Sequence, residues 1–396
     1  MKDKNFSQLN NSNYFISPKI LYGINVLYNI ESELNRLGYK NILLITNEVL
    51  KNTSAVESFI KYLFKNLGYS VKIFTTEAKE PTLDMVKAVV EFTRSEKDGI
   101  VIGLGGGSVM DQSKIAAVLA KNTGEIEDFV GDEKVKNNGL PLMLVPATAG
   151  TGSEVSMSGL FVNSDGKKLQ IKSRKMLASL AIVDPVVTLS LPPKPTAYTG
   201  MDALSHAIES IMSINCTSLI MPIALEAVSL IKNNLPTVYL DGSNIHARLN
   251  MSIGSTLAGL SLNSGVVLGH SIGYTLDRFG LPHGMGVAVA LAYITKFNLN
   301  IIPDKIRCIS KAMGYEGDFD DFLKVSSFLV DSIKSLIKLL DIPLSLQPFG
   351  INLDTAYKLA DECYSKYPRP NNPRKYTRDE IREIYKQMYK GVIAVD

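Results

Sequence analysis

The first half of the sequence alternates short apolar runs with segments that carry helix signals, and this alternation restricts the folds open to the chain. The runs are rich in leucine and β-branched residues and cover residues 40–46, 70–74, 99–104, 140–146 and 180–185. Segments with helix signals, ending at Gly38 and Gly68, precede the first two runs. Strands that are apolar on both faces are typical of a parallel sheet covered by helices. We therefore predict an α/β, doubly wound, Rossmann-like domain over residues 1–188, with a hairpin around residues 164–166.

The pattern changes after Pro193, where long segments repeat apolar residues at helical spacing. These segments cover residues 218–234, 245–262, 319–340 and 377–390. The last begins with Thr377 followed three positions later by Glu380, which is the signature of a capping box. A chain of 396 residues is also too long for one small core. We predict a second, all-helical domain over residues 189–396.

Composition excludes several classes of protein. The net charge of +3 is too small, for this length, to indicate a nucleic-acid or membrane-surface partner. The 3 cysteines are scattered without a CxxC spacing, which argues against a disulfide framework or a cysteine metal site. The first residues are polar, and no apolar run is long enough to span a bilayer. We expect a cytoplasmic protein.

Histidine is scarce in this chain, and its placement predicts a metal site. Asp202 and His206 stand four residues apart in an expected helix, so they share one face and could bind one ion, although an exposed ion-paired face fits the pair alone. His270 and His283 lie in apolar, glycine-flanked segments where a polar ring is unexpected. The fourth histidine, His246, lies in a polar run and is interpreted as a surface residue. Asp202, His206, His270 and His283 together form a complete ligand set for one divalent cation.

Two glycine-rich loops predict a site for a phosphate-bearing cofactor. Residues 103–108 join the third apolar run to a helix, and glycines there would let the backbone N–H groups approach a phosphate. The loop matches neither GxGxxG nor a Walker motif, so a tight structural turn is an alternative. Residues 146–154 follow the fourth run and offer the hydroxyls of Thr148 and Thr151 to a diphosphate or ribose, or to a cap of the next segment. Loops after parallel strands share one sheet edge, so both loops should line one crevice.

Taken together, these motifs resemble the iron-containing (group III) alcohol dehydrogenase family over nearly the whole chain. The matching segments are residues 19–23, 105–108 with Asp111 and Lys114, 149–154, 184–185, 200–206 and 282–284. The resemblance implies an N-terminal dinucleotide-binding domain and a C-terminal helical domain, an architecture shared with dehydroquinate synthase. It places the metal and the substrate in the cleft between the two domains.

The resemblance also implies roles for individual residues. The metal ligands match Asp202, His206, His270 and His283, with Fe(II) favoured over Zn(II). The NAD or NADP positions match Asn47, Gly105, Gly106, Gly107, Ser108, Asp111, Thr148, Thr151 and Lys168. Two positions depart from the pattern. Asn47 stands where many members have an acidic residue that repels a 2′-phosphate, so NADP use is compatible with this chain. Tyr274 stands where many members have a second histidine, which leaves no obvious histidine for a proton relay.

The segment between His270 and His283, together with residues 371–374, looks like the phosphonoacetaldehyde reductase branch. Arg278 and Arg374 could hold an anionic substrate group in bidentate fashion beside Tyr274, although surface salt bridges are the alternative. The expected function is metal-dependent, NAD(P)-linked reduction of a small aldehyde or oxidation of an alcohol, with phosphonoacetaldehyde and 2-hydroxyethylphosphonate as a candidate pair. A neutral aldehyde or diol dehydrogenase, a metal-dependent lyase like dehydroquinate synthase, and a non-catalytic binding protein are the alternatives. We expect a homodimer.

Overall fold

The computed structural model describes residues 17–96 and 98–393. Its N-terminal half contains a six-stranded sheet in the order β1-β9-β6-β4-β2-β3, and each of its strand pairs is parallel. The strands are β1 (Lys19–Tyr22), β2 (Asn41–Asn47), β3 (Ser70–Thr76), β4 (Ile100–Gly105), β6 (Leu142–Pro146) and β9 (Leu180–Val183). The five predicted strands are confirmed, and β1 adds an edge strand that was not predicted because it contains no buried apolar run.

Helices cover both faces of this sheet, as continuous apolar strands require. The helices are α1 (Glu31–Leu37), α2 (Glu48–Lys51), α3 (Ser54–Lys61), α4 (Leu83–Ser95) and α5 (Gly107–Leu119). Leu43 and Ile45 of β2 pack with residues of α4 and α5, whereas Ile42 and Leu44 pack with residues of α1 and α3. The alternation of side chains along one buried strand therefore supplies two separate cores.

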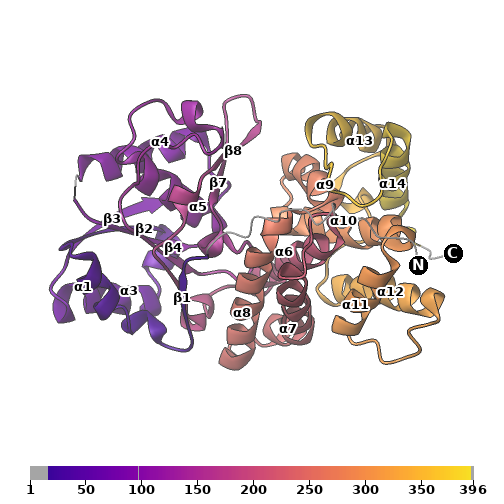
Figure 1. The fold of residues 1–396 in the computed structure, drawn as a ribbon, viewed down its shortest axis with the longest axis horizontal. Helices are drawn as coiled ribbons and strands as arrows, with labels where there is room; N and C mark the ends of the chain where they lie inside the picture. The colour runs from indigo at the N-terminus through magenta and orange to yellow at the C-terminus, as the bar shows by residue number, and fades with distance from the viewer. Residues whose placement is uncertain (1–16, 97, 394–396) are drawn as a thin grey trace, which may run out of the picture.

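A smaller sheet of three strands stands beside α5, in the order β5-β8-β7. Its strands are β5 (Gly131–Asp132), β7 (Ser158–Val162) and β8 (Lys168–Lys172). The antiparallel pairing of β7 with β8 confirms the hairpin predicted around residues 164–166. Strand β8 begins with Lys168 and extends toward the helical half of the molecule (Figure 1).

The C-terminal half consists of helices, as predicted, and lies beside the sheet-containing half in Figure 1. The helices are α6 (Pro193–Met212), α7 (Ile220–Leu240), α8 (Ile245–Ser261), α9 (Leu268–Leu276), α10 (His283–Asn298), α11 (Pro303–Ala312), α12 (Phe322–Leu339), α13 (Leu353–Lys366) and α14 (Arg378–Lys390). Both halves of the capping box predicted at Thr377 are present in α14.

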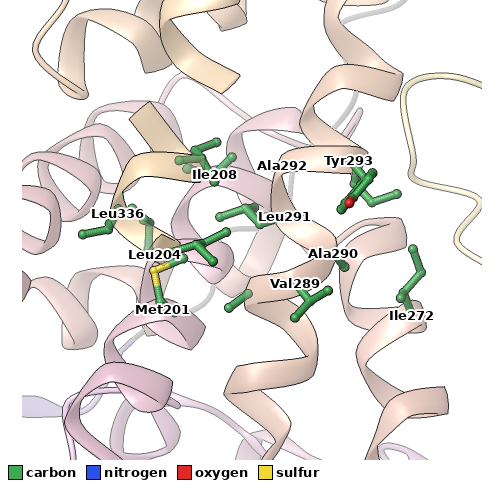
Figure 2. Packing of buried hydrophobic residues seen from close by; sticks show 14 of the residues in the cluster. Met201, Leu204, Ile208, Ile272, Val289, Ala290, Leu291, Ala292, Tyr293 and Leu336 are labelled. Carbon is green, nitrogen blue, oxygen red and sulfur yellow. The ribbon is translucent and has the colours of Figure 1, made fainter. Parts of the chain in front are cut away.

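Helix α6 is the central element of the helical half. Every residue from Gly200 to Met212 is buried, so the helix has no solvent-facing stripe. Figure 2 shows Met201, Leu204 and Ile208 of α6 in one apolar cluster with Leu291 of α10. Polar residues inside such a helix are costly to bury unless they have partners or ligands.

Over the described residues, no single helix is long and apolar enough to cross a membrane. One pair of helices bent by 110°, residues 245–264 with 268–279, would be long and apolar enough by length and composition alone.

Candidate metal and cofactor site

Three histidine side chains surround one carboxylate oxygen of Asp202, and the four residues come from three helices. Helix α6 supplies Asp202 and His206, α9 supplies His270, and His283 is the first residue of α10. Oδ1 of Asp202 lies 3.7 Å from Nε2 of His206, 3.6 Å from Nε2 of His270 and 3.9 Å from Nε2 of His283. The ligand atoms of Asp202, His270 and His283 all lie within 4.8 Å of one another. The structure thus brings together all four residues that the sequence singled out.

These side chains fit a single divalent cation. Asp202 and His206 are buried, which excludes an exposed ion-paired helix face. Oδ1 of Asp202 and Nε2 of His270 are both buried without a hydrogen-bond partner among the described residues, an arrangement that a shared cation would satisfy. Two ligand atoms bound tetrahedrally at ~2.1 Å from one ion are ~3.4 Å apart. This separation is close to the distances from Oδ1 of Asp202 to the three Nε2 atoms. His283, whose side chain is 28% exposed, marks the open side of the site.

Two acidic residues that the sequence analysis missed hold the histidines. Nδ1 of His270 donates to Oε1 of Glu209 at 2.8 Å, and the backbone N–H of His270 donates to Oε2. The carboxylate fits because position 269 is glycine: a Cβ there would lie 2.5 Å from Oε1 of Glu209. Nδ1 of His283 lies 3.3 Å from both carboxylate oxygens of Asp277. Glu209 could have been found, since it is an acid seven residues after Asp202 on the same face of an apolar helix.

The electrostatics of the cluster favour the protonation states that a metal requires at Asp202 and His206, but not at His270. Burial raises the pKa of Asp202, but the surrounding imidazoles outweigh burial and hold that pKa well below its ordinary value. Burial lowers the pKa of His206 to about 4, so its ring is neutral near neutral pH. Burial also disfavours a charged His270, but the nearby carboxylates of Glu209 and Asp202 raise its pKa to about 10. A bound cation would replace that proton.

The two glycine-rich loops lie side by side at the carboxyl ends of β4 and β6, where Gly105 pairs with Pro146. A Cβ on Gly107 would lie 2.5 Å from Cγ2 of Thr151, and one on Gly106 would lie 3.4 Å from Cγ2 of Thr148. The close contact between the loops therefore requires glycine at position 107, whereas a Cβ at position 106 would make an ordinary contact. Helix α5 begins at Gly107, so its free N–H groups point to this edge of the sheet. The common edge expected from the sequence is confirmed.

Other residues predicted near the cofactor form contacts within the protein. The Ser108 hydroxyl donates to the backbone carbonyl of Lys79 at 2.5 Å. Asp111 forms a buried ion pair with Lys114 at 3.0 Å and accepts a hydrogen bond from the Ser153 hydroxyl at 2.6 Å. The Asp111 carboxylate thereby ties α5 to the second loop. Its position supports the shape of the crevice.

Asn47 lies at the end of β2, at the same sheet edge. Its side-chain oxygen accepts a hydrogen bond from the backbone N–H of Leu50 at 2.9 Å and so caps the short helix α2. Asn47 is buried and pairs across the sheet with Thr76 of β3. The carboxamide is therefore fixed in place, without the negative charge that an aspartate would bring.

Lys168 crosses from the sheet-containing half to the helical half. Its Nζ lies 2.5 Å from Oε1 of Glu80, 3.4 Å from Oδ2 of Asp277 and 4.8 Å from the centre of the Tyr274 ring. Burial disfavours the charged amine, but Asp277 and Glu80 outweigh burial and raise the pKa of Lys168. Tyr274 in turn stacks on His283 with ring centres 5.4 Å apart. Lys168 and Tyr274 thus lie against the metal-ligand cluster.

The structure does not bring the two predicted substrate arginines together. Arg278 forms an ion pair with Glu362 of α13, and its side chain is 49% exposed. Arg374 forms an ion pair with Glu380 at 2.8 Å and stacks over the ring of Phe297 at 4.1 Å. Phe297 is near the end of α10, whose 16 residues place it about 20 Å from the metal ligand at the start of that helix. Both arginines therefore match the alternative, a salt bridge, and no sequence pattern indicated this separation.

Comparison with known proteins agrees with the two halves of the fold. Residues 17–185 match the family model described as iron-containing alcohol dehydrogenase. Residues 196–389 match the model for the C-terminal part of the Fe-containing alcohol dehydrogenase family. Together these matches account for most of the chain.

Individual relatives differ in the substrates that their names state. The chain is 34% identical to long-chain-alcohol dehydrogenase 1 of Geobacillus thermodenitrificans, over 94% of this chain and 95% of that protein. It is 29% identical to sulfoacetaldehyde reductase of Bilophila wadsworthia, over 96% and 99%. Among solved structures, a 1,3-propanediol oxidoreductase has a TM-score of 0.90 at 30% identity, covering 94% of this chain and 99% of that one. The metal-ligand cluster, the glycine loops and these matches agree, and the chain belongs to the iron-containing alcohol dehydrogenase family.

Proposed function

We propose that this protein transfers hydride between a nicotinamide dinucleotide and a small alcohol or aldehyde, with a divalent cation held by Asp202, His206, His270 and His283. The observation that carries the proposal is the unpartnered Asp202 carboxylate oxygen, buried within 3.9 Å of three imidazoles. When bound, the cation supplies Lewis-acid chemistry to the substrate oxygen and the nicotinamide supplies or accepts the hydride.

The chain itself would bind and orient the reactants. The N–H groups at the start of α5, together with Gly105, Gly106 and Gly107, are suited to the cofactor diphosphate. The hydroxyls of Thr148 and Thr151 and the amine of Lys168 are suited to its ribose and nicotinamide half. We assign this work to residues 1–188 and the metal and substrate to residues 189–396. Substrate oxygen would reach the cluster on the side of His283, the most exposed of the four ligands.

Cofactor choice and substrate are the finer parts of the proposal. Asn47 brings no carboxylate to repel a 2′-phosphate, which supports use of NADPH as well as NADH. A sulfoacetaldehyde reductase is among the relatives, and a related structure from Bifidobacterium kashiwanohense was solved with NAD+. We therefore propose reduction of a short aldehyde, phosphonoacetaldehyde being one candidate. The chain is also 31% identical to a 1,3-propanediol dehydrogenase of Citrobacter freundii, and this similarity supports a neutral substrate as the second candidate.

The test is an anaerobic assay of metal-free protein reconstituted with Fe(II) or with Zn(II). Oxidation of NADH and NADPH is followed with phosphonoacetaldehyde and with propanal, and untreated metal-free protein serves as the blank. Metal-dependent, stoichiometric oxidation of the reduced cofactor is expected. The His270→Ala and His283→Ala variants should lose turnover while still binding cofactor. Absence of net cofactor oxidation with every metal and aldehyde would refute a dehydrogenase and favour a lyase.

A further inference from the structure

Arg369 lies close to the metal-ligand cluster in the segment that joins α13 to α14. Its Nε donates a hydrogen bond to the Ser271 hydroxyl at 2.9 Å, and its backbone N–H donates to the Tyr376 hydroxyl at 2.6 Å. Ser271 is the residue after the ligand His270 in α9. The guanidinium carbon lies 5.6 Å from the centre of the Tyr274 ring. These contacts fix the guanidinium beside the exposed end of the cluster.

This arginine differs from its neighbours in having no acidic partner among the residues that the structure describes. Arg278 is paired with Glu362, and Arg374 is paired with Glu380. Within residues 17–96 and 98–393, no carboxylate forms a salt bridge with Arg369. A guanidinium has five N–H donors, so four remain on its Nη atoms after the bond to Ser271. A partly buried cation with free donors and no counter-ion is suited to an anionic ligand.

The aromatic residues around Arg369 connect it to the metal-ligand cluster. The cationic groups of Arg369 and Lys168 both lie over the Tyr274 ring, and this ring also stacks on His283. Tyr367 packs against the same ring with centres 5.4 Å apart. Lys168 is already neutralised by two carboxylates, whereas Arg369 is not.

We propose that Arg369 binds the anionic head group of a short aldehyde, a phosphonate or a sulfonate, and so selects the substrate class. The proposal rests on the proposed function and adds to it the residue that recognises charge. Arg369 and the metal ligand His283 both contact the Tyr274 ring, so a short aldehyde held at the cluster would lie along that ring with its head group toward Arg369. A planar fork of donors matches a tetrahedral oxyanion in bidentate fashion, as a lysine cannot.

The test compares charged substrates with a neutral one of the same shape. Steady-state kcat/KM of the metal-loaded enzyme is measured with phosphonoacetaldehyde, sulfoacetaldehyde and 3,3-dimethylbutanal, in which a tert-butyl group replaces the oxyanion. We expect the wild type to prefer an anionic aldehyde. Arg369→Gln should lower kcat/KM for that aldehyde on the order of 10- to 100-fold, chiefly through KM, and should lower kcat/KM for the neutral aldehyde much less. Arg369→Lys should fall between the two.

Arg378 provides a matched control, because it also lies over a tyrosine ring, that of Tyr364, but pairs with Asp361 at 3.6 Å. Arg378→Gln should leave kcat/KM unchanged for both the charged and the neutral aldehyde. An independent readout is calorimetric binding of ethylphosphonate and of ethanesulfonate, which should be lost in Arg369→Gln. The stronger of the two ligands identifies whether the site takes phosphonate or sulfonate.

Three results would count against the proposal. An equal fall of kcat/KM for charged and neutral aldehydes would show that Arg369 acts only through Ser271 and Tyr274. A wild-type preference for 3,3-dimethylbutanal would overturn the assignment of an anionic substrate, as would unchanged anion binding in Arg369→Gln. Failure of every aldehyde would instead refute the proposed function, and the calorimetric comparison would still decide whether Arg369 binds an anion.

Discussion

Replacement of Glu209 by glutamine is a sharp test of how the metal site is held. Glu209 is fully buried and accepts two hydrogen bonds from His270, one from the ring and one from the backbone. In Glu209→Gln the amide oxygen can keep one of these bonds, but the NH2 group then faces an N–H donor. The side chain has little room to move aside, because it is fully buried and its carboxylate packs against the backbone of Gly269.

The expected loss is about 2 kcal/mol of metal-binding free energy. A hydrogen bond to a charged group contributes about 1.5–3 kcal/mol. Changes to such supporting carboxylates typically weaken metal binding by about 10- to 100-fold, which corresponds to ~1.4–2.7 kcal/mol. Both routes give roughly a 30-fold increase in Kd.

The assay is competition for Zn(II) between the protein and a chromophoric chelator, which avoids oxidation of iron. Glu226→Gln, an exposed change on α7, is the control and should leave Kd unchanged. Circular dichroism and thermal melts of the metal-free proteins verify that both variants fold. Wild-type metal affinity in a folded Glu209→Gln protein would show that the contact with His270 does not support the site, and the reasoning would fail.

Three further predictions concern the cofactor and the junction of the two halves. Asn47→Asp keeps the helix cap and adds a charge, so the ratio of kcat/KM for NADPH to that for NADH should fall about 10-fold or more; an unchanged ratio would remove this position from 2′-phosphate selection. Gly107→Ala places a methyl group 2.5 Å from Thr151, and dinucleotide Kd, measured by fluorescence titration, should rise while the metal affinity is retained. Burial raises the pKa of Glu154 above 4.5, with the Thr256 hydroxyl acting in the opposite direction. Its stabilising contribution is therefore present below the unfolded pKa and lost as pH rises through the folded one. Glu154→Gln should gain stability relative to the wild type as the pH rises above 4.5 in urea titrations, and a constant difference would contradict the shift.

Local signals were sufficient for the principal elements. Gly38 ends α1 with positive φ, and Thr377 caps α14, each at the residue where the sequence indicated it. Strand β1 was missed because it is an edge strand without a buried residue, unlike the equally short β9, and β5 was missed because it has two residues. Pairing with a neighbouring strand, which no local pattern records, decides the conformation of both.

The site residues also fall into those that local sequence patterns reveal and those that depend on contacts between separate elements. The metal ligands could be predicted because a histidine in an apolar, glycine-flanked segment is conspicuous before any fold is known. Arg369 and Asp277 were missed because their roles depend on contacts between separate elements. Arg374 was expected at the substrate for a related reason: its motif gave no indication that the length of α10 lies between it and the cluster.

The origin of all four metal ligands in the helical half has a mechanical consequence. The three cysteines of the described chain are free, so no covalent bond joins its distant segments. A cation shared by His206 on α6 and His270 on α9 closes a loop of about 60 residues, which in the chain-entropy treatment of a cross-link restricts the unfolded chain by ~4 kcal/mol. The metal would thus be a reversible cross-link between α6, α9 and α10. Chelation would loosen the helical half selectively and leave the sheet that carries the cofactor loops intact.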